Sequence, residues 1–324
     1  MNVLITGGAG FLGARLAREI LQAGELGLAG EEARPVARLT LLDQVPAPAD
    51  LAADPRVSVV TADLGTADAE EILSSLREVD VVFHLAAAVS GECEADFDLG
   101  MRANLSGTQH LLSACRSSIT SPVVVYASSV AVFGAGVVAD DTMPVPETSY
   151  GTQKVIGEYL LADYTRKGFL RGRALRLATI SVRPGRPNAA ASGFLSGIIR
   201  EPLAGIRAVC PVDPATEAVL ASPARAVAGL LRAASATDGD WGGRTAVNLP
   251  AISVSVAEMV AALTRVAGPA AAELIDFVPD PAIQRMLANW PSRIASARGA
   301  RLGLVPDADY DSIIRAHLAD LAER

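Results

Sequence analysis

A chain of 324 residues is long enough to bury a sizeable core, either as one elaborated domain or as two lobes. Half of the residues are apolar and a fifth are charged, a composition that excludes an intrinsically disordered protein. The formal net charge is -8 and no cluster of Lys and Arg stands out, which argues against a nucleic-acid partner.

The cysteines and the N-terminus bear on compartment and metal content. Three cysteines show no metal-ligand spacing and cannot all pair, so we expect buried or free thiols in a reducing compartment and no metal site. Met1 leads directly into the apolar run Val3–Ile5 without the pattern of a secretory signal. No apolar run approaches the length that spans a bilayer. We therefore expect a soluble, cytoplasmic protein with no membrane partner.

In the first half of the chain, short β-branched runs alternate with helical patterns, which predicts βαβ units and a parallel sheet. Strands are predicted at residues 3–6, 39–42, 57–60, 79–84, 123–127 and 173–177. Helices are predicted at 11–23, 67–77, 96–117 and from about 149 to 167, with a loop insertion at 24–38. The predicted fold class is α/β, a Rossmann doubly wound parallel sheet with a smaller C-terminal lobe.

The pattern changes after residue 178, where a turn-rich stretch at 183–188 and several prolines indicate the smaller lobe. A predicted helix at 222–234 and strand at 246–249 can return to the main sheet. We therefore predict a first domain over 1–178, rejoined by about 217–250, and a second lobe over 179–216 and 251–324.

The glycine-rich run Gly7–Gly13 lies between the first predicted strand and the first predicted helix. Glycines let the backbone approach a pyrophosphate, and the helix N-terminus offers N–H groups and a partial positive charge. The position predicts a dinucleotide-binding loop. Asp43 ends the second predicted strand, where a carboxylate accepts hydrogen bonds from the adenosine ribose and repels a 2′-phosphate, which favours NAD over NADP. The alternative is that Asp43 opens a turn before Pro46. Asp63, after the third strand, could reach the adenine or cap a helix.

Tyr150 and Lys154 lie four residues apart near the start of a predicted helix, so both project from one face. A lysine beside a tyrosine favours the phenolate, the form that a general base needs. Lys154 can also hold the nicotinamide ribose. In isolation such a pair is more often an ordinary surface pair. Ser128 and Ser129 end the fifth predicted strand, where parallel sheets place ligands. One serine is expected to hold the substrate oxygen and the other to make strand-end hydrogen bonds.

With these features in place, the sequence resembles the extended short-chain dehydrogenase/reductase family, also called the NAD-dependent epimerase/dehydratase family, over essentially the whole chain. The matching residues are Gly7, Gly10, Gly13, Asp43, Asp63-Leu64, His84-Leu85-Ala86-Ala87, Asn104-x-x-Gly107-Thr108, Ser128-Ser129-x-x-x-Phe133-Gly134 and Tyr150-Gly151-x-x-Lys154. The resemblance implies that Ser129, Tyr150, Lys154 and Asn104 are catalytic. Ser129 follows from registration on Phe133-Gly134, and Asn104 from relatives in which this asparagine supports a water and proton path to the lysine.

The resemblance also implies which residues contact NAD. They are Gly7, Gly10, Phe11, Leu12, Gly13, Asp43, Asp63, Leu64, Leu85, Ala86, Ala87, Tyr150, Lys154 and Thr179. Thr179 follows Ala178, where relatives more often have proline, and we expect this change to be mild because the backbone makes the contact. His84 is expected to line the cofactor site structurally.

Three stretches, 89–100, 182–192 and 199–205, resemble family members that use NAD⁺ to oxidise the C2 hydroxyl of a four-carbon sugar acid to the 2-oxo acid. The carboxylate of such a substrate calls for an arginine fork or several donors. Arg183 and Arg186 follow the last predicted sheet strand, and a solvated surface charge is an equal alternative for Arg186. The expected substrate contacts are Ser90, Ser129, Tyr150, Arg183, Asn188 and Ser192.

Two alternative functions stay open. A sugar-nucleotide or uronate epimerase or dehydratase would keep NAD bound through its cycle, but Ser222-Pro223 stands where nucleotide-sugar relatives carry an arginine for the diphosphate. A non-catalytic NAD sensor would usually have lost the tyrosine or the lysine. By analogy with relatives, the helices at 96–117 and 149–167 are expected to pair in a homodimer.

Overall fold

The computed structural model describes residues 1–74, 78–185 and 192–322. The chain divides into two compact units. Unit 1 comprises Met1–Ser129, Thr148–Arg176 and Val227–Val247. Unit 2 comprises Val130–Glu147, Leu177–Ala226 and Asn248–Arg324.

A seven-stranded sheet forms the centre of unit 1, with the strand order β13-β9-β7-β6-β1-β4-β5. The strands are β1 (Asn2–Thr6), β4 (Arg38–Asp43), β5 (Val57–Thr61), β6 (Val81–His84), β7 (Val123–Ser129), β9 (Arg171–Leu177) and β13 (Val247–Asn248). β1 pairs in parallel with β4 on one side and with β6 on the other. The chain order therefore reverses between β1 and β6, and in such sheets ligands bind beyond the carboxyl ends of the strands at this switch point.

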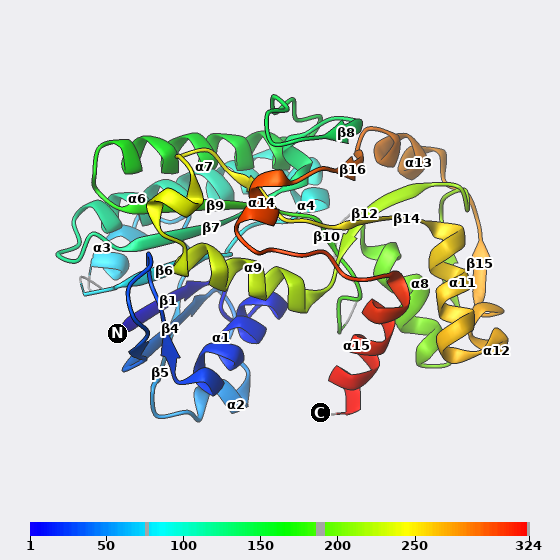
Figure 1. Ribbon diagram of the computed structural model, residues 1–324, viewed down its shortest axis with the longest axis horizontal. Helices are drawn as coiled ribbons and strands as arrows, with labels where there is room; N and C mark the ends of the chain where they lie inside the picture. Colours follow the sequence, from blue (N-terminus) through cyan, green and yellow to red (C-terminus); the bar gives the residue numbers. More distant parts are fainter. Residues whose placement is uncertain (75–77, 186–191, 323–324) are drawn as a thin grey trace. The chain divides into compact units, whose positions relative to one another are not determined.

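Helices cover both faces of this sheet, which is why its central strands are apolar on both sides. Figure 1 shows α1 (Phe11–Ala23) on one face and α3 (Ala69–Ser74), α6 (Gly107–Arg116) and α7 (Ser149–Arg166) on the other. The remaining helices are α2 (Ala49–Ala52), α4 (Ser90–Ala95), α5 (Phe97–Gly100), a π-helix at Met101–Ser106, α10 (Asp238–Trp241) and the later part of α9 (Pro223–Ser235). The predicted fold class is confirmed.

The predicted elements of unit 1 agree with the structure to within a few residues, with two differences. The predicted loop at 24–38 contains two short antiparallel strands, β2 (Glu25–Leu26) and β3 (Arg34–Pro35). The helix predicted at 96–117 consists of α5, the π-helix and α6. A π-helix inserts extra backbone into a helix without changing its apolar period visibly, so periodicity alone does not reveal it. Residues 75–77 of the helix predicted at 67–77 lie outside the described residues.

Unit 2 is built from small sheets and short helices. Its strands are β8 (Gly136–Val138), β10 (Thr179–Ile180), β11 (Ala208–Cys210), β12 (Glu217–Ala221), β14 (Ile252–Ser255), β15 (Ile275–Phe277) and β16 (Pro291–Ile294), in sheets β10-β12-β14, β11-β15 and β16-β8. Its helices are α8 (Gly193–Leu203), α11 (Val256–Ala267), α12 (Pro269–Ala272), α13 (Pro281–Ala288), α14 (Ala297–Arg301) and α15 (Tyr310–Ala322), together with the first residues of α9. A 3-10 turn spans Val130–Val132.

The boundary between the units differs from the predicted division. Residues 130–147 and 217–226 belong to unit 2, whereas the sequence analysis placed both in the first domain, and the segment that rejoins unit 1 is 227–247. Strand pairing explains the difference, because β8 pairs with β16 and β12 pairs with β10 and β14. These partners lie far away in the sequence, so no local pattern shows them.

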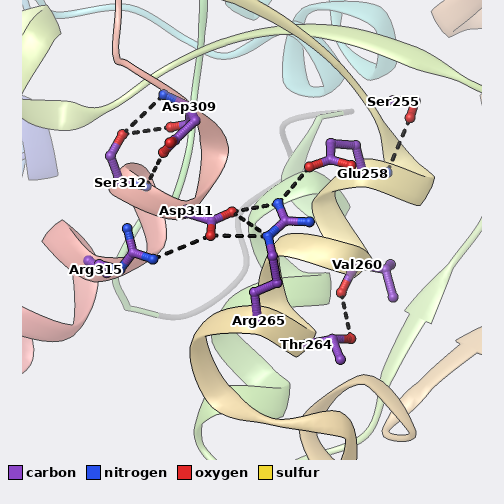
Figure 2. A network of polar contacts seen from close by, with 9 residues as sticks. All are labelled: Ser255, Glu258, Val260, Thr264, Arg265, Asp309, Asp311, Ser312 and Arg315. Carbon is purple, nitrogen blue, oxygen red and sulfur yellow. Dashed lines mark hydrogen bonds and ion pairs between the residues drawn. The ribbon is translucent and has the colours of Figure 1, made fainter.

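A polar network joins α11 and α15 in unit 2 (Figure 2). The Arg265 guanidinium contacts Asp311 Oδ1 at 2.6 Å and Glu258 Oε1 at 2.6 Å, and Arg315 adds a contact of 3.3 Å to Asp311 Oδ2. Arg265 holds the pKa of Asp311 below its usual range. Apolar residues of the same two helices, including Met259 and Ile313, pack in the core of unit 2. The network therefore lies over an apolar helix contact.

Candidate active site

The glycine loop of unit 1 has a backbone shape that side chains would prevent. Gly7 has a positive φ of 71°, and a Cβ built on it would lie 2.7 Å from Ala86 N. A Cβ at Gly13 would overlap the carbonyl oxygen of Gly7. Helix α1 begins at Phe11 behind Gly10, which has no side chain to cap the first N–H groups. These N–H groups and the positive end of the helix are suited to an anion such as a pyrophosphate.

Asp43 ends β4 and is tied to the glycine loop. Its Oδ2 accepts a hydrogen bond of 3.0 Å from Ala9 N, and its Oδ1 accepts one of 2.7 Å from Gln44 N. The second bond is the turn contact that the sequence analysis kept as an alternative. The half-buried carboxylate thus lies beside the loop at the carboxyl edge of the sheet.

Asp63 and Leu64 make contacts that are structural in kind. Asp63 Oδ1 accepts a hydrogen bond of 2.7 Å from Gly65 N, and this shapes the turn after β5. The Leu64 side chain is buried in the core of unit 1, and its carbonyl oxygen is 2.8 Å from His110 Nδ1. Of the other predicted cofactor contacts, Phe11, Leu12, Leu85, Ala86 and Ala87 are half-buried.

His84 lies at the end of β6 in a chain of buried hydrogen bonds. The Thr108 hydroxyl donates to the carbonyl oxygen of Asn104 at 2.6 Å, so it accepts from His84 Nε2 at 2.9 Å. Nδ1 is then the acceptor of the Thr6 hydroxyl at 2.6 Å. Burial lowers the pKa of His84 to about 3, so the ring is neutral and serves as a link between β1 and α6.

The two serines at the end of β7 have different surroundings. Ser128 is buried and donates a hydrogen bond of 2.5 Å to Glu158 Oε1 on α7. Ser129, the next residue, is half-buried at the carboxyl end of the strand. Ser128 therefore makes the internal strand-end bond, and Ser129 is the serine whose side chain remains partly exposed.

Tyr150 and Lys154 lie on the first turns of α7, which begins behind the N-cap Thr148. Lys154 is buried, and its Nζ donates to the carbonyl oxygen of Ala127 at 2.9 Å. The same Nζ lies 5.6 Å from the centre of the Tyr150 ring and 4.9 Å from that of Tyr126. Burial lowers the pKa of Lys154 to about 8. The spacing-based prediction that the ammonium lies beside the tyrosine ring is confirmed.

Asn104 is buried in the π-helix next to this pair. Its Oδ1 accepts from Ala88 N at 2.7 Å, and its Nδ2 donates to Gln153 Oε1 at 2.8 Å. π-helical turns inside helices often mark functional sites. Gln153 directly precedes Lys154 in α7, so Asn104 is connected to the lysine through the neighbouring residue.

Several predicted substrate contacts lie in unit 2. Arg183 is half-buried, and its guanidinium donates to Ile180 O at 3.2 Å and to the Ser192 hydroxyl at 2.9 Å. Ser192 is buried. Thr179, a predicted cofactor contact, belongs to β10 and pairs with Leu220 of β12. Asn188 and Arg186 lie outside the described residues.

Ser90 and Ser222 lie at helix starts. Ser90 begins α4 in unit 1 and is half-buried. In unit 2 the Ser222 N–H donates to Asp307 Oδ2 at 2.8 Å, and its hydroxyl accepts from Arg225 N at 3.2 Å at the start of α9. Ser222-Pro223 is thus a helix start tied to a neighbouring carboxylate.

Comparison with known proteins places the chain in a family. The model of the NAD dependent epimerase/dehydratase family matches residues 3–212. The chain belongs to this family. It is 52% identical to a D-erythronate dehydrogenase of Cupriavidus necator over 99% of this chain and 98% of that protein. It is 39% identical to a D-erythronate dehydrogenase of Haemophilus influenzae over 97% and 98%.

A solved structure agrees closely with the whole fold. The nucleoside-diphosphate-sugar epimerase from Agrobacterium tumefaciens has a TM-score of 0.92 and 41% identity, covering 100% of this chain and 95% of that one. Family membership makes the protein an NAD-dependent enzyme. The residues of unit 1 fit this cofactor, because a Cβ would fill the cradle at Gly7 and Gly13 and a carboxylate stands beside it.

Three buried polar residues of this site were not predicted from the sequence: Gln153, Glu158 and Arg176. A signal for Glu158 was present, because Tyr150, Lys154 and Glu158 recur at intervals of four and so share a helix face. Arg176 lies within a predicted strand, and its pairing with Glu158 depends on tertiary structure. Within residues 1–74, 78–185 and 192–322 no group of three His, Cys, Asp or Glu side chains could hold a metal. None of the helices in those ranges is both long and apolar enough to cross a membrane.

Proposed function

We propose that this protein oxidises the C2 hydroxyl of D-erythronate to the 2-oxo acid with NAD⁺. The observation that carries the proposal is 52% identity over 99% of the chain to a protein named D-erythronate dehydrogenase. The second relative of that name, at 39% identity over 97% of the chain, supports it. The geometry of unit 1 supports alcohol oxidation, since a serine, a tyrosine and a buried lysine lie at adjoining ends of β7 and α7.

In this proposal Tyr150 takes the proton of the substrate hydroxyl as general base. The Lys154 ammonium beside the ring favours the phenolate, and the Ser129 hydroxyl donates a hydrogen bond to the substrate oxygen. Bound NAD⁺ supplies the acceptor for the hydride that leaves C2. Asn104 is proposed to act through its position next to Gln153 and the lysine turn.

The cofactor contacts are proposed as the resemblance implies them. The backbone of the glycine loop would hold the pyrophosphate, Asp43 the adenosine ribose, and Lys154 the nicotinamide ribose. The other proposed contacts are Phe11, Leu12, Asp63, Leu64, Leu85, Ala86, Ala87, Tyr150 and Thr179.

Arg183 is proposed to bind the substrate carboxylate. Its guanidinium is held by Ile180 O and the Ser192 hydroxyl, which fixes the orientation of the planar fork that a carboxylate would meet. Ser192 would then orient Arg183 as well as contact substrate. Ser90 and Asn188 stay predicted contacts for substrate hydroxyls.

A spectrophotometric assay tests the proposed reaction. Purified protein with NAD⁺ and D-erythronate should form NADH in stoichiometric amount with the 2-oxo acid, and C4 to C6 aldonates and uronates serve as competing substrates. Absence of NADH formation with D-erythronate, alongside turnover of another acid, would reassign the substrate. Replacing NAD⁺ by NADP⁺ should weaken turnover because Asp43 repels a 2′-phosphate.

A second candidate function is the epimerisation of a nucleotide sugar. The observation in its favour is 41% identity over the full chain to a solved structure described as a nucleoside-diphosphate-sugar epimerase. Ser222-Pro223 argues against epimerisation of a nucleotide sugar. These two residues begin α9 where nucleotide-sugar relatives carry an arginine that binds the diphosphate. Conversion of a uridine-diphosphate sugar without net NADH release would establish this second function in place of the first.

We also infer a homodimer that works in a reducing compartment such as the cytoplasm. Phe97 on α5 and Tyr159 on α7 are 60% and 64% exposed, and Val155 and Ile156 lie half-buried on the same side of α7 as Tyr159. Large exposed apolar side chains on helices are suited to a protein interface. All three cysteines are free and buried, as expected for a reducing compartment. Light scattering of the purified protein tests the dimer, and Tyr159→Glu should shift it to monomer.

A further inference from the structure

A buried ion pair lies behind the catalytic residues of unit 1. Arg176 on β9 donates from Nε to Glu158 Oε1 at 2.8 Å and from Nη2 to Glu158 Oε2 at 2.7 Å. Both side chains are 7% exposed. The Ser128 hydroxyl on β7 donates to the same Oε1 at 2.5 Å. One carboxylate on α7 thus accepts three hydrogen bonds from two strands of the sheet.

Strand β7 and helix α7 carry residues of the proposed chemistry, and β9 contacts α7 through Arg176. Ser128 directly precedes Ser129 on β7. Glu158 lies on α7 at intervals of four after Tyr150 and Lys154, on the face that packs toward the sheet. The main-chain carbonyl of Ala127, which precedes Ser128, accepts from Lys154 Nζ at 2.9 Å. Helix and strand are therefore joined at two neighbouring points, Ala127 with Lys154 and Ser128 with Glu158.

Apolar packing alone could provide the same stability. Replacing a buried ion pair by apolar residues of similar volume is often neutral or stabilising. A bidentate Arg–carboxylate pair instead adds geometric specificity, because both hydrogen bonds require one orientation. Sliding α7 along the sheet would break three hydrogen bonds at once, so the pair opposes a shift that apolar contacts would tolerate.

We propose that Glu158, Arg176 and Ser128 form a positioning device that sets the register of α7 against β7 and so places Tyr150 and Lys154 opposite Ser129. This inference rests on the proposed function, which assigns the chemistry to those three residues. None of the three positioning residues touches substrate in this proposal. Their effect on turnover passes through Ser129 and Lys154.

Charge gives the device a second effect on Lys154. The titratable groups that face this ammonium are Tyr150 and Glu158 on α7, Tyr126 on β7, His84 on β6 and Cys93 on α4. His84 is neutral, and burial raises the pKa of Cys93 and of Tyr126. Glu158 is thus the carboxylate in this group and favours the protonated lysine.

Ser128→Ala is the first test, because it removes the tether and leaves both charges paired. We expect kcat for D-erythronate to fall by about tenfold, as a small misplacement of reacting groups costs this much or more. NAD⁺ affinity, measured by protein fluorescence, should stay as in the wild type, and so should the alkaline limb of the kcat/KM pH profile.

Charge removal is the second test. Glu158→Gln removes the carboxylate that favours the protonated Lys154, so the alkaline limb of kcat/KM should move to lower pH by about one unit. The double variant Glu158→Met with Arg176→Met removes the positioning contacts without leaving a buried unpaired charge, and its kcat should fall by about tenfold. If Glu158→Gln does not fold, kcat of the double variant and of Ser128→Ala tests whether the three residues position Tyr150 and Lys154.

Asp163→Asn is the matched control, because Asp163 forms an exposed ion pair with Arg166 on the same helix. It should leave kcat and the pH profile unchanged. Wild-type kcat per folded enzyme in both Ser128→Ala and the double variant would overturn the proposal and leave the device merely structural. An equal loss in Asp163→Asn would overturn it too.

Tyr150→Phe separates this inference from the function on which it rests. Loss of turnover in Tyr150→Phe together with wild-type kcat in Ser128→Ala refutes the positioning device alone. Full turnover of D-erythronate by Tyr150→Phe refutes the proposed chemistry itself.

Discussion

Two sets of charged contacts, one in each unit, differ in how far water reaches them. In unit 1, Lys154, Glu158 and Arg176 are buried and bonded to each other or to the backbone. In unit 2, the Arg265 and Glu258 side chains are 49% and 53% exposed, and that of Asp311, which Arg265 also contacts, is 12% exposed. Water solvates and screens the charges of Arg265 and Glu258, whereas those of Lys154, Glu158 and Arg176 act at short range in a medium of low dielectric constant.

The distances and angles between polar groups matter most where those groups are buried. Buried polar groups are costly unless they are paired, so each must find a partner at a defined distance. Around Lys154 these requirements order the ends of β7 and α7 and the π-helix, which carry Ser129, Tyr150 and Asn104. Unit 2 has a contiguous apolar core and can change its surface charges at small cost.

Tyr150→Phe should have the largest effect of any single change, because it removes the general base and keeps the ring. We expect kcat to fall by about 10³-fold, within the range for general acid–base catalysis. NAD⁺ binding, followed by fluorescence, should be retained. Turnover within a few-fold of the wild type would break the assignment of chemistry to unit 1.

Lys154→Met should lower activity strongly and raise stability, because it removes a buried charge. The folded-state pKa of Lys154 is about 8, below the unfolded value of about 10.4. The folded protein thus binds fewer protons than the unfolded one between these values, so wild-type stability rises with pH through this window. Lys154→Met should therefore be more stable below pH 8, by up to ~3 kcal/mol less the lost hydrogen bond to Ala127, and the advantage should vanish near pH 10.

Denaturant unfolding of both proteins at several pH values measures this effect. Activity offers a second readout, since kcat/KM of the wild type should fall as the pH rises through about 8 and Lys154 loses its charge. A stability difference independent of pH would show that the ammonium carries no burial cost.

Asp43→Asn should have an intermediate effect that is confined to the cofactor. The amide removes the charge that repels a 2′-phosphate and weakens acceptance from the ribose hydroxyls. We expect KM for NAD⁺ to rise by about 10- to 100-fold and the preference over NADP⁺ to shrink, since one hydrogen bond to a charged group is worth about 1.5–3 kcal/mol. An unchanged cofactor preference in steady-state assays would leave Asp43 with its turn contact to Gln44 alone.

Asp311→Asn, in the network of Figure 2, should have the smallest effect. Arg265 lowers the pKa of Asp311, so the carboxylate stabilises the fold above the unfolded pKa and loses this effect as the pH falls through the folded pKa. We expect Asn to lower Tm by about 1–2 °C at pH 7 and to make no difference in strong acid, because water screens the half-exposed Arg265 and Arg315 and the amide can still accept hydrogen bonds from them. A large loss of Tm would erase the contrast between the units.

The sequence predicted those features of the fold that depend on local pattern. The glycine loop, the helix from Phe11 to Ala23 and the apolar strands follow from residues next to each other. Gly24 ends that helix with a positive φ of 72°, a position that glycine tolerates best. The Tyr150–Lys154 spacing predicted a shared helix face for the same reason, since helix geometry is local.

Tertiary structure alone decided the contacts that define the site. The choice between Ser128 and Ser129 depends on Glu158, 30 residues away, and the state of His84 depends on Thr6 and Thr108 from two other elements. The boundary between the units depends on which distant strands pair. The family, the dinucleotide loop and the order of elements could be predicted from the residues alone, because neighbouring residues encode them. The register of α7 against the sheet was decided by buried polar groups whose partners come together only when the chain is folded.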